Sequence, residues 1–276
     1  MKIEGKCTDD GDESTAGRVL FIAVGGLDPT GGAGLVRDLL TARALGARVH
    51  LVPAAWTEQS AAAGVSAVEP RAPASLSRAL ETAWKAAAAE AIPSAVKVGM
   101  LPDGEAMRAV IDALRGYEGP VVFDPVLGAS SGGALFRDPP RVLSPMLARA
   151  TLVTPNGPEA VALLGRPGLE RLGVEDAEQL GRGLIDAGAR AVLVKGGHLA
   201  GHTAVDTLVT ATAVRRFTAS RLAGPNVRGT GCALGTAIAV GLGRREPLED
   251  AVAGAKRWLH AALGRAVAVG PEWHLD

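Results

Sequence analysis

Short apolar runs alternate with longer helical segments along most of this sequence, and this alternation limits the possible folds more than any other feature. The short runs fall at residues 18–24, 48–55, 95–98, 120–123, 151–154 and 191–194. The first of them, residues 18–24, lacks the polar alternation of a half-exposed strand, which is typical of a strand buried on both faces. The helical segments between them fall at residues 35–45, 74–91, 103–115, 173–187 and 248–263, and residues 205–209 and 213–217 predict a hairpin. This order predicts an α/β fold with a largely parallel sheet and helices on both faces.

The composition is that of a domain with a large aliphatic core. Apolar residues make up 47% of the 276 residues and aromatic residues only 3%, so Ala, Val and Leu must fill the interior. No Pro/Ser-rich linker or charge block divides the chain, and residues 18–276 are predicted to form a single domain. Residues 1–17 are polar and acidic, without the apolar stretch of a secretory signal, and are predicted to be a disordered leader.

Charge and cysteine content exclude several classes of partner. Lys and Arg together number 29, as do Asp and Glu, so the net charge is zero and nucleic acid is not an expected partner. No apolar run approaches the roughly 20 residues of a membrane span, so no membrane partner is expected either. Cys7 and Cys232 are the two cysteines of the sequence and give no disulfide framework. We therefore expect a cytoplasmic protein.

The segment Gly229-Thr230-Gly231-Cys232 predicts a site for an anion such as phosphate. Its two glycines allow successive N–H groups to turn toward one point, and the helix that follows adds unpaired N–H groups and a positive dipole end. Cys232 would lie in the first helical turn, where the pKa of a thiol tends to fall toward neutrality, and could act as a base. The alternative is a tight loop before a packed helix, with Cys232 as a small buried apolar residue.

Polar side chains follow several of the predicted strands. Gln59 lies in a polar segment after the second strand, Asp124 follows the fourth and Lys195 follows the strand at residues 191–194. Ligands in open α/β sheets gather at the carboxyl ends of strands, so these side chains are candidate ligand contacts. Structural alternatives exist for others: Asn156 and Glu159 have the spacing of a helix capping box, and an isolated Asp-Pro is most often part of a turn.

Six short motifs occur in one order along the chain. They are Asp28-Pro29-x-Gly31-Gly32-Ala33-Gly34, Lys97-Val98-Gly99-Met100-Leu101, Asp124-Pro125-Val126, Thr154-Pro155-Asn156-x-x-Glu159-Ala160, Val194-Lys195-Gly196-Gly197-His198 and Gly229-Thr230-Gly231-Cys232. Together they resemble the hydroxymethylpyrimidine/phosphomethylpyrimidine kinases of thiamine biosynthesis, within the ribokinase-like superfamily. The resemblance extends from residue 18 to the tail at residues 269–276.

This resemblance implies a ribokinase-like three-layer α/β/α sandwich, ATP and Mg²⁺ as cofactors, and a homodimer. It also implies transfer of the γ-phosphate of ATP to the hydroxymethyl group of 4-amino-5-hydroxymethyl-2-methylpyrimidine, and then to the resulting monophosphate. Two alternatives remain at this point. One is a pyridoxal kinase of the same fold, and the other is a nucleotide-binding regulator without catalytic activity.

The resemblance assigns residues to the substrate pocket. Gln59 matches the side chain that hydrogen-bonds the aminopyrimidine, and a carboxamide offers the donor and the acceptor that an amino group beside a ring nitrogen requires. The other matching pocket positions are Gly26, Asp38, Met100 and Val126. Asp38 could alternatively be a solvent-facing residue of its helix.

The resemblance also assigns the phosphate end. Asp124 and Glu159 match acidic positions near Mg²⁺, directly or through water, because Mg²⁺ usually takes only one or two carboxylates. The matching nucleotide-binding positions are Asn156, Lys195, Gly229 and Gly231.

For catalysis, the amides of Gly229, Thr230, Gly231 and Cys232 are assigned to the charge that develops on the γ-phosphate oxygens. Cys232 is assigned as the base for the hydroxymethyl proton. Two positions depart from the family pattern: Arg228 replaces a histidine and Ser60 replaces an asparagine. Ser60 borders the pyrimidine pocket, so this departure bears on substrate preference.

Overall fold

The computed structural model describes residues 19–60, 64–129, 132–166, 173–197, 202–222, 224, 226–270 and 272–275. The predicted disordered leader at residues 1–17 lies outside these ranges. So do Cys7 and His198, the last residue of one of the six motifs.

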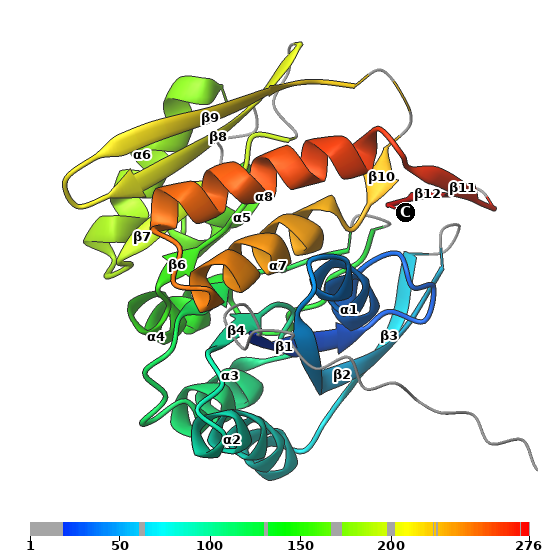
Figure 1. Cartoon of the computed structure of the whole chain (residues 1–276), viewed down its shortest axis with the longest axis vertical. Helices are drawn as coiled ribbons and strands as arrows, with labels where there is room; N and C mark the ends of the chain where they lie inside the picture. The colour runs from blue at the N-terminus through cyan, green and yellow to red at the C-terminus, as the bar shows by residue number, and fades with distance from the viewer. Residues whose placement is uncertain are drawn as a thin grey trace, which may run out of the picture.

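A nine-stranded sheet runs through the centre in the order β3-β2-β1-β4-β5-β6-β7-β8-β9 (Figure 1). Its strands are β1 (Leu20–Leu27), β2 (Arg48–Ser60), β3 (Gly64–Pro70), β4 (Ser94–Val98), β5 (Val121–Phe123), β6 (Leu152–Val153), β7 (Ala191–Val194), β8 (Thr203–Thr210) and β9 (Val214–Ser220). The pairings from β2 through β1 and β4 to β7 are parallel, whereas β3, β8 and β9 pair antiparallel. The predicted parallel sheet and the hairpin β8–β9 are therefore confirmed.

Helices cover both faces of this sheet. One face carries α1 (Gly34–Ala44), α7 (Thr230–Gly243) and α8 (Leu248–Leu263). The other carries α2 (Pro73–Ala89), α3 (Gly104–Ala113), α4 (Ser144–Arg149) after a 3-10 turn (Pro140–Leu143), α5 (Gly157–Leu163) and α6 (Val174–Asp186). Successive side chains of β1 enter opposite cores: Phe21 packs in the core under α1 and α7, and Ile22 in the core under α2 and α3. The predicted three-layer sandwich is confirmed.

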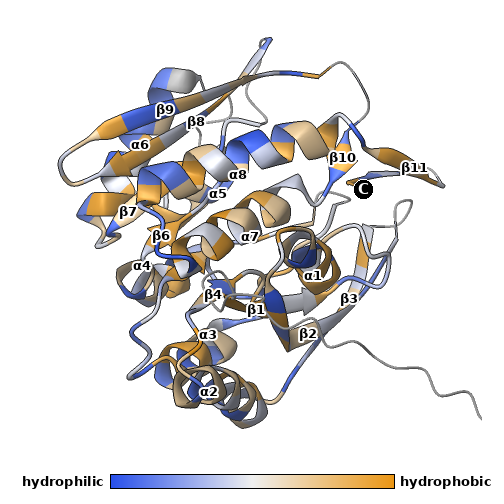
Figure 2. Cartoon of the chain, viewed as in Figure 1, coloured by the Kyte–Doolittle hydropathy of each residue, from blue (hydrophilic) through white to orange (hydrophobic). Residues whose placement is uncertain are grey.

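Helix α7 is buried over most of its length. Residues 233–243 are all shielded from solvent, because α7 lies on the sheet with α1 and α8 beside it. Apolar and small residues accordingly run along α7, whereas α8 carries several polar residues on its exposed side (Figure 2). The helix that starts at the Gly-Thr-Gly-Cys loop is thus held firmly in the core.

Two parts of the chain differ from the prediction. Residues 269–276 were expected to be a tail, but β11 (Val267–Val269) and β12 (Glu272–His274) form a small sheet with β10 (Val227–Arg228), in the order β10-β12-β11. Strand β3 was not predicted; it pairs with β2, whose residues beyond Trp56 extend past the end of β1. Strands of two or three residues are too short to give a periodic pattern, which is why the small sheet escaped prediction.

The order of the strands places the site. β2 lies on one side of β1, and β4 to β7 follow on the other, so the sheet order reverses at β1. In open α/β sheets the ligand-binding crevice lies at the carboxyl ends of the strands beside such a reversal. Within the described ranges, no helix combines the length and the apolar character that crossing a membrane requires.

Candidate active site

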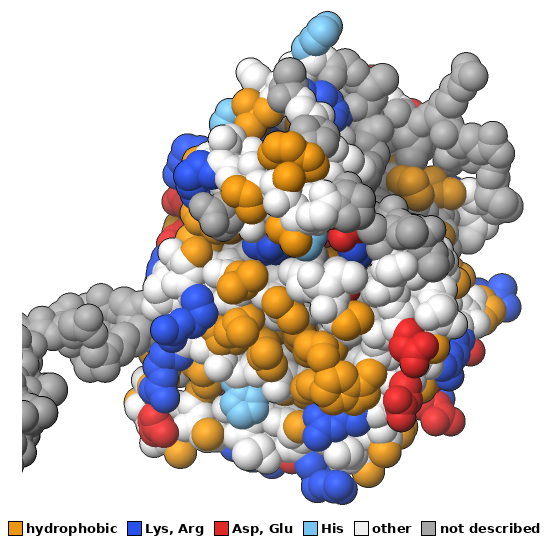
Figure 3. Space-filling model, turned by 90° about the vertical axis from the view of Figure 1, so that its right-hand side faces the viewer, with side chains coloured by type: hydrophobic (Ala, Val, Ile, Leu, Met, Phe, Trp, Pro, Cys, Tyr) orange, Lys and Arg blue, Asp and Glu red, His pale blue; other side chains and the backbone are white. Residues whose placement is uncertain are grey.

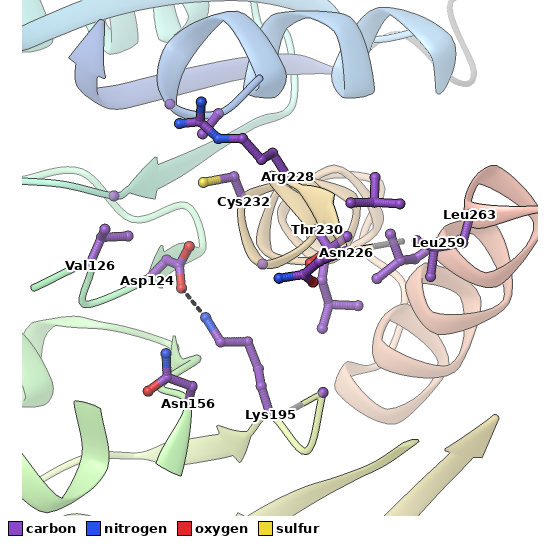
Figure 4. A pocket seen from close by; sticks show the side chains of 18 of the residues that line it. Asp124, Val126, Asn156, Lys195, Asn226, Arg228, Thr230, Cys232, Leu259 and Leu263 are labelled. Carbon is purple, nitrogen blue, oxygen red and sulfur yellow. Dashed lines mark hydrogen bonds and ion pairs between the residues drawn. The ribbon is translucent and has the colours of Figure 1, made fainter. Parts of the chain in front are cut away.

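A cleft at the carboxyl ends of the central strands contains every residue that the sequence predicted for the site. It is lined by Gly26, Asp38, Gln59, Met100, Asp124, Val126, Asn156, Glu159, Lys195, Gly229, Thr230, Gly231 and Cys232. We call its phosphate side, around Asp124 and Lys195, the deep end, and the side around Gln59 the ring end. In Figure 4, Cys232 reaches into the cleft from the start of α7, above Asp124 and Lys195.

The loop before α7 needs glycine for steric reasons. Gly229 precedes the helix with φ of 73°, and a Cβ at this position would lie 2.2 Å from the carbonyl oxygen of Gly32. The close approach joins the glycine-rich turn after β1 to the loop before α7. Because the first N–H groups of a helix have no partner within it, the start of α7 presents donors and a positive dipole end to the cleft.

Asp124 and Lys195 form an ion pair at the deep end. The Nζ atom of Lys195 lies 2.6 Å from Oδ1 of Asp124 and 3.8 Å from Oε2 of Glu159. Oδ1 also accepts a hydrogen bond from Thr154 at 3.2 Å, whereas the buried Oδ2 of Asp124 has no hydrogen-bond partner among the described residues. Burial opposes ionisation of Asp124, but the charges of Lys195 and Lys97 outweigh it and lower its pKa. Asp124 is thus an ionised carboxylate with one oxygen free for a cation.

Asn156 and Glu159 form the capping box that their spacing predicts. The side chain of Asn156 accepts from the Glu159 amide at 2.8 Å, and Oε2 of Glu159 accepts from the Asn156 amide at 2.7 Å. One oxygen of Glu159 is therefore used in starting α5. Its proposed contribution to a metal site depends on the remaining oxygen and on the nearby Lys195.

A second buried lysine, Lys97, was not recognised as a site residue. It projects from β4 and is 1% exposed, with Nζ 2.8 Å from Oδ1 of Asp38 and 4.0 Å from Oδ2 of Asp124. Thr236 of α7 donates to the same Asp38 oxygen at 2.8 Å. Burial alone would lower the pKa of Lys97, but these carboxylates and Cys232 raise it, so the lysine stays charged. A charged residue inside the apolar run at 95–98 was the available signal.

The alternative that Asp38 faces solvent is wrong, since its side chain is 2% exposed and paired with Lys97. The expectation for the Cys232 thiol is also wrong. Burial raises the pKa of Cys232 to about 11, and the nearby Lys97 and a hydrogen bond from the Gly34 amide compensate only in part. The dipole of α7 therefore does not by itself produce a thiolate at neutral pH.

Arg228 organises the ring end. Its guanidinium donates to both carboxylate oxygens of Glu272 at 2.8 and 2.9 Å, to Asp28 at 3.1 Å and to the hydroxyl of Thr30 at 3.2 Å. It also lies 3.5 Å from Oε1 of Gln59. The sequence marked Arg228 as a departure from the family pattern but gave no sign of these partners, because they lie 44 to 200 residues away along the chain.

A family model for phosphomethylpyrimidine kinase matches residues 28–275. The chain belongs to this family. As a member of the phosphomethylpyrimidine kinase family, it is a phosphotransferase that uses ATP as the phosphoryl donor. A relative from Rhizobium meliloti, named hydroxymethylpyrimidine/phosphomethylpyrimidine kinase, is 39% identical over 90% of this chain and 91% of its own. The protein of the same name from Escherichia coli is 38% identical over 90% and 92%.

Solved structures show the same fold. The phosphomethylpyrimidine kinase from Clostridium difficile superposes with a TM-score of 0.70 at 30% identity, over 89% of this chain and 99% of that one. The pyridoxal kinase from Staphylococcus aureus, in complex with pyridoxal, gives a TM-score of 0.81 at 23% identity, over 93% and 92%. At 23% identity, the similarity to the pyridoxal kinase supports the shared fold but not a shared function.

Proposed function

We propose that this kinase phosphorylates the hydroxymethyl group of 4-amino-5-hydroxymethyl-2-methylpyrimidine and then the resulting monophosphate, in thiamine biosynthesis. The observation that carries the proposal is the arrangement of a single cleft. Its deep end holds Lys195 and the start of α7, which suit phosphates, next to ionised Asp124, which suits a cation, and its ring end holds the carboxamide of Gln59. The groups proposed to bind phosphates and the carboxamide proposed to bind the ring edge thus face the same cleft.

The chemistry follows from these positions. Phosphoryl transfer requires mainly positioning and stabilisation of charge. The first N–H groups of α7 and the ammonium of Lys195 bind the γ-phosphate oxygens, while Gln59 holds the ring so that its hydroxymethyl arm points at Cys232. The thiolate form of Cys232 takes the hydroxyl proton as the oxygen attacks the γ-phosphorus, and the bond from this phosphorus to ADP breaks. In the second step the acceptor is an anionic phosphate, which needs little deprotonation.

The deep end has the groups that Mg²⁺ requires. Oδ2 of Asp124 is buried without a hydrogen-bond partner among the described residues, and Glu159 lies beside Lys195, the lysine that pairs with Oδ1. No group of three or more His, Cys, Asp or Glu gathers in the described part of the chain, which suits a metal held by one or two carboxylates, waters and substrate phosphates. When bound there, Mg²⁺ would neutralise phosphate charge.

The metal assignment is tested by Asp124→Asn and Glu159→Gln. Each should lower activity and move its Mg²⁺ dependence to higher concentration, since each removes a negative charge next to the ion. Glu159→Gln retains an oxygen that can accept from the Asn156 amide, so its thermal stability should change little. Loss of activity with an unchanged Mg²⁺ dependence would leave Glu159 with its capping role alone.

The substrate is tested by a coupled ADP assay over four acceptors: the aminopyrimidine alcohol, its monophosphate, pyridoxal and ribose. We expect turnover of the first two compounds and weak or no turnover of ribose. Turnover of pyridoxal above that of the aminopyrimidine would make the chain a pyridoxal kinase. Absence of ADP release with every acceptor would favour a nucleotide-binding regulator.

We also propose a homodimer. Hydrophobic side chains gather on the face that carries α1 and β2 (Figure 3), and Leu40 and Trp56 there are 50% and 52% exposed. An apolar face of this kind on a folded protein marks an interaction surface. Light scattering should give twice the monomer mass of 28.0 kDa, and Trp56→Glu should shift the mass toward that of the monomer. A monomeric wild type would reject the proposal.

A further inference from the structure

The carboxamide of Gln59 is contacted on both of its polar atoms. Its Nε2 lies 3.2 Å from the hydroxyl oxygen of Thr57, and its Oε1 lies 3.5 Å from Nη2 of Arg228. The second distance is at the outer limit of a hydrogen bond, so that contact acts chiefly through the attraction between a cation and the carbonyl dipole. The two contacts come from different strands, Thr57 from β2 and Arg228 from β10.

Each contact accepts only one orientation of the carboxamide. The hydroxyl hydrogen of Thr57 is committed to the carbonyl oxygen of Leu27, at 2.9 Å, so the Thr57 oxygen can only accept from its other neighbour. A guanidinium can only donate. If the carboxamide of Gln59 were reversed, its oxygen would face an acceptor and its N–H groups would face a positive charge. Both neighbours therefore select the same orientation independently.

Arg228 is itself fixed. Its side chain is buried, and Glu272 and Asp28 hold the guanidinium from two directions. Asp28 in turn accepts from the amides of Thr30 at 2.9 Å and Ala33 at 3.1 Å, so it is part of the rigid glycine-rich turn. Nη1 donates to both oxygens of Glu272 while Nη2 donates to Asp28, so one planar guanidinium spans two carboxylates, a geometry that a lysine ammonium does not reproduce.

We propose that Arg228 is a positioning residue for substrate selection, which fixes the orientation of the Gln59 carboxamide and so decides which ring edge the pocket accepts. The inference rests on the proposed role of Gln59 in binding the ring. With the orientation fixed, the free N–H of Gln59 always lies on one side as a hydrogen-bond donor, and its carbonyl oxygen lies on the other side as an acceptor. That order suits an amino group next to an unprotonated ring nitrogen. A ring in which a carbonyl replaces the amino group, with hydrogen on the adjacent nitrogen, presents the reverse order and is rejected.

The test compares two acceptors, the aminopyrimidine alcohol and its 4-oxo analogue, on each enzyme. The measured quantity is the ratio of their kcat/KM values, which is independent of the fraction of active protein. Arg228→Lys keeps the charge that balances Asp28 and Glu272 but loses the reach to Gln59. We expect the wild type to prefer the amino compound and Arg228→Lys to reduce the ratio by about tenfold, the effect of about one buried hydrogen bond. The KM for ATP should not change.

Two further variants make the result decisive. Thr57→Val removes the acceptor on the other side of the carboxamide and should also reduce the ratio. Arg244→Lys is the matched control, because Arg244 is exposed at the far end of α7 and bonds to the carbonyl of Leu45; its ratio should equal that of the wild type. If Arg228→Lys does not fold, Glu272→Gln loosens the same guanidinium and must reduce the ratio.

The possible results distinguish a failure of the role proposed for Arg228 from a failure of the proposed kinase function. An unchanged ratio in Arg228→Lys, a fall in Thr57→Val alone, or a wild type without preference would overturn the role of Arg228 while the proposed kinase function stands. A wild type that does not phosphorylate the amino compound at all would overturn the proposed function, and the inference with it.

Discussion

The two ends of the cleft are built in different ways. At the deep end, Lys97, Asp124 and Lys195 lie on or just after parallel strands of the central sheet, and both Lys97 and Asp124 are 1% exposed. At the ring end, Arg228, Asp28 and Glu272 come from the short strand β10, a turn and the last strand β12, and they meet over long separations in sequence. The sheet itself therefore positions the groups for phosphoryl transfer, whereas selection of the acceptor depends on connections around its edge. This contrast predicts that substitutions at the deep end affect rate and stability, and that those at the ring end affect substrate affinity.

The largest effect is expected at Cys232 in the deep end. Cys232→Ser keeps the backbone donors of the loop but replaces the thiol with a hydroxyl of far higher pKa. Phosphorylation of the alcohol should slow by about 10²–10⁴-fold, the usual range for general-base catalysis. Phosphorylation of the monophosphate should fall much less, as single-turnover assays with each acceptor would show. Equal losses in both steps would instead mean that Cys232 serves only to shape the loop.

A loss of stability is expected from Lys97→Met, which leaves the buried Asp38 carboxylate without its main partner. Removing one member of a buried ion pair costs about 3–5 kcal/mol of the free energy of unfolding. The double variant Lys97→Met/Asp38→Leu should recover part of this loss, because no unpaired charge then remains. Urea denaturation of the wild type, Lys97→Met, Asp38→Leu and the double variant measures the coupling, and additive losses would show that the two side chains do not interact.

At the ring end the effect should appear in affinity. Gln59→Leu leaves the polar edge of the ring without partners, which costs about 1–3 kcal/mol and raises the KM for the pyrimidine accordingly. The KM for ATP should stay near that of the wild type, because the proposed site for the nucleotide phosphates is at the other end of the cleft. An unchanged KM for the pyrimidine would show that Gln59 does not recognise the ring. The predicted functional difference between the two ends of the cleft would then be lost.

The last expected effect is a dependence on pH. Since burial raises the pKa of Cys232 to about 11, the thiol is protonated at neutral pH, and the thiolate fraction increases with pH until that value is reached. If the thiolate is the base, kcat/KM for the alcohol should rise about tenfold per pH unit above neutrality. The monophosphate reaction should show a weaker dependence. A plateau of kcat/KM already reached at pH 8 would mean that the pKa of the thiol in the free enzyme is far lower.

The same contrast explains what the sequence could predict. Asp124 and Lys195 directly follow apolar runs, so the sheet rule was enough to place them together. Lys97 was harder, because its position within a buried strand signals a paired charge but does not identify the partner Asp38. The pairs of Arg228 with Asp28 and Glu272 left no local pattern, since they depend on tertiary contacts and on strands of two or three residues. The pKa of Cys232 depends on how deeply packing buries the thiol, which helix position alone does not determine.

The small sheet of β10, β12 and β11 has a consequence for the order in which the protein is made. Strands β1 to β7 are complete once residue 194 has been synthesised, so the parallel part of the central sheet can form early. Glu272, which holds Arg228, is synthesised after every strand of the central sheet and after helices α7 and α8. A nascent chain can thus have its folded core before it has an ordered ring end. A chain that stops before Glu272 would leave the guanidinium of Arg228 without this partner, and its discrimination between substrates should be impaired.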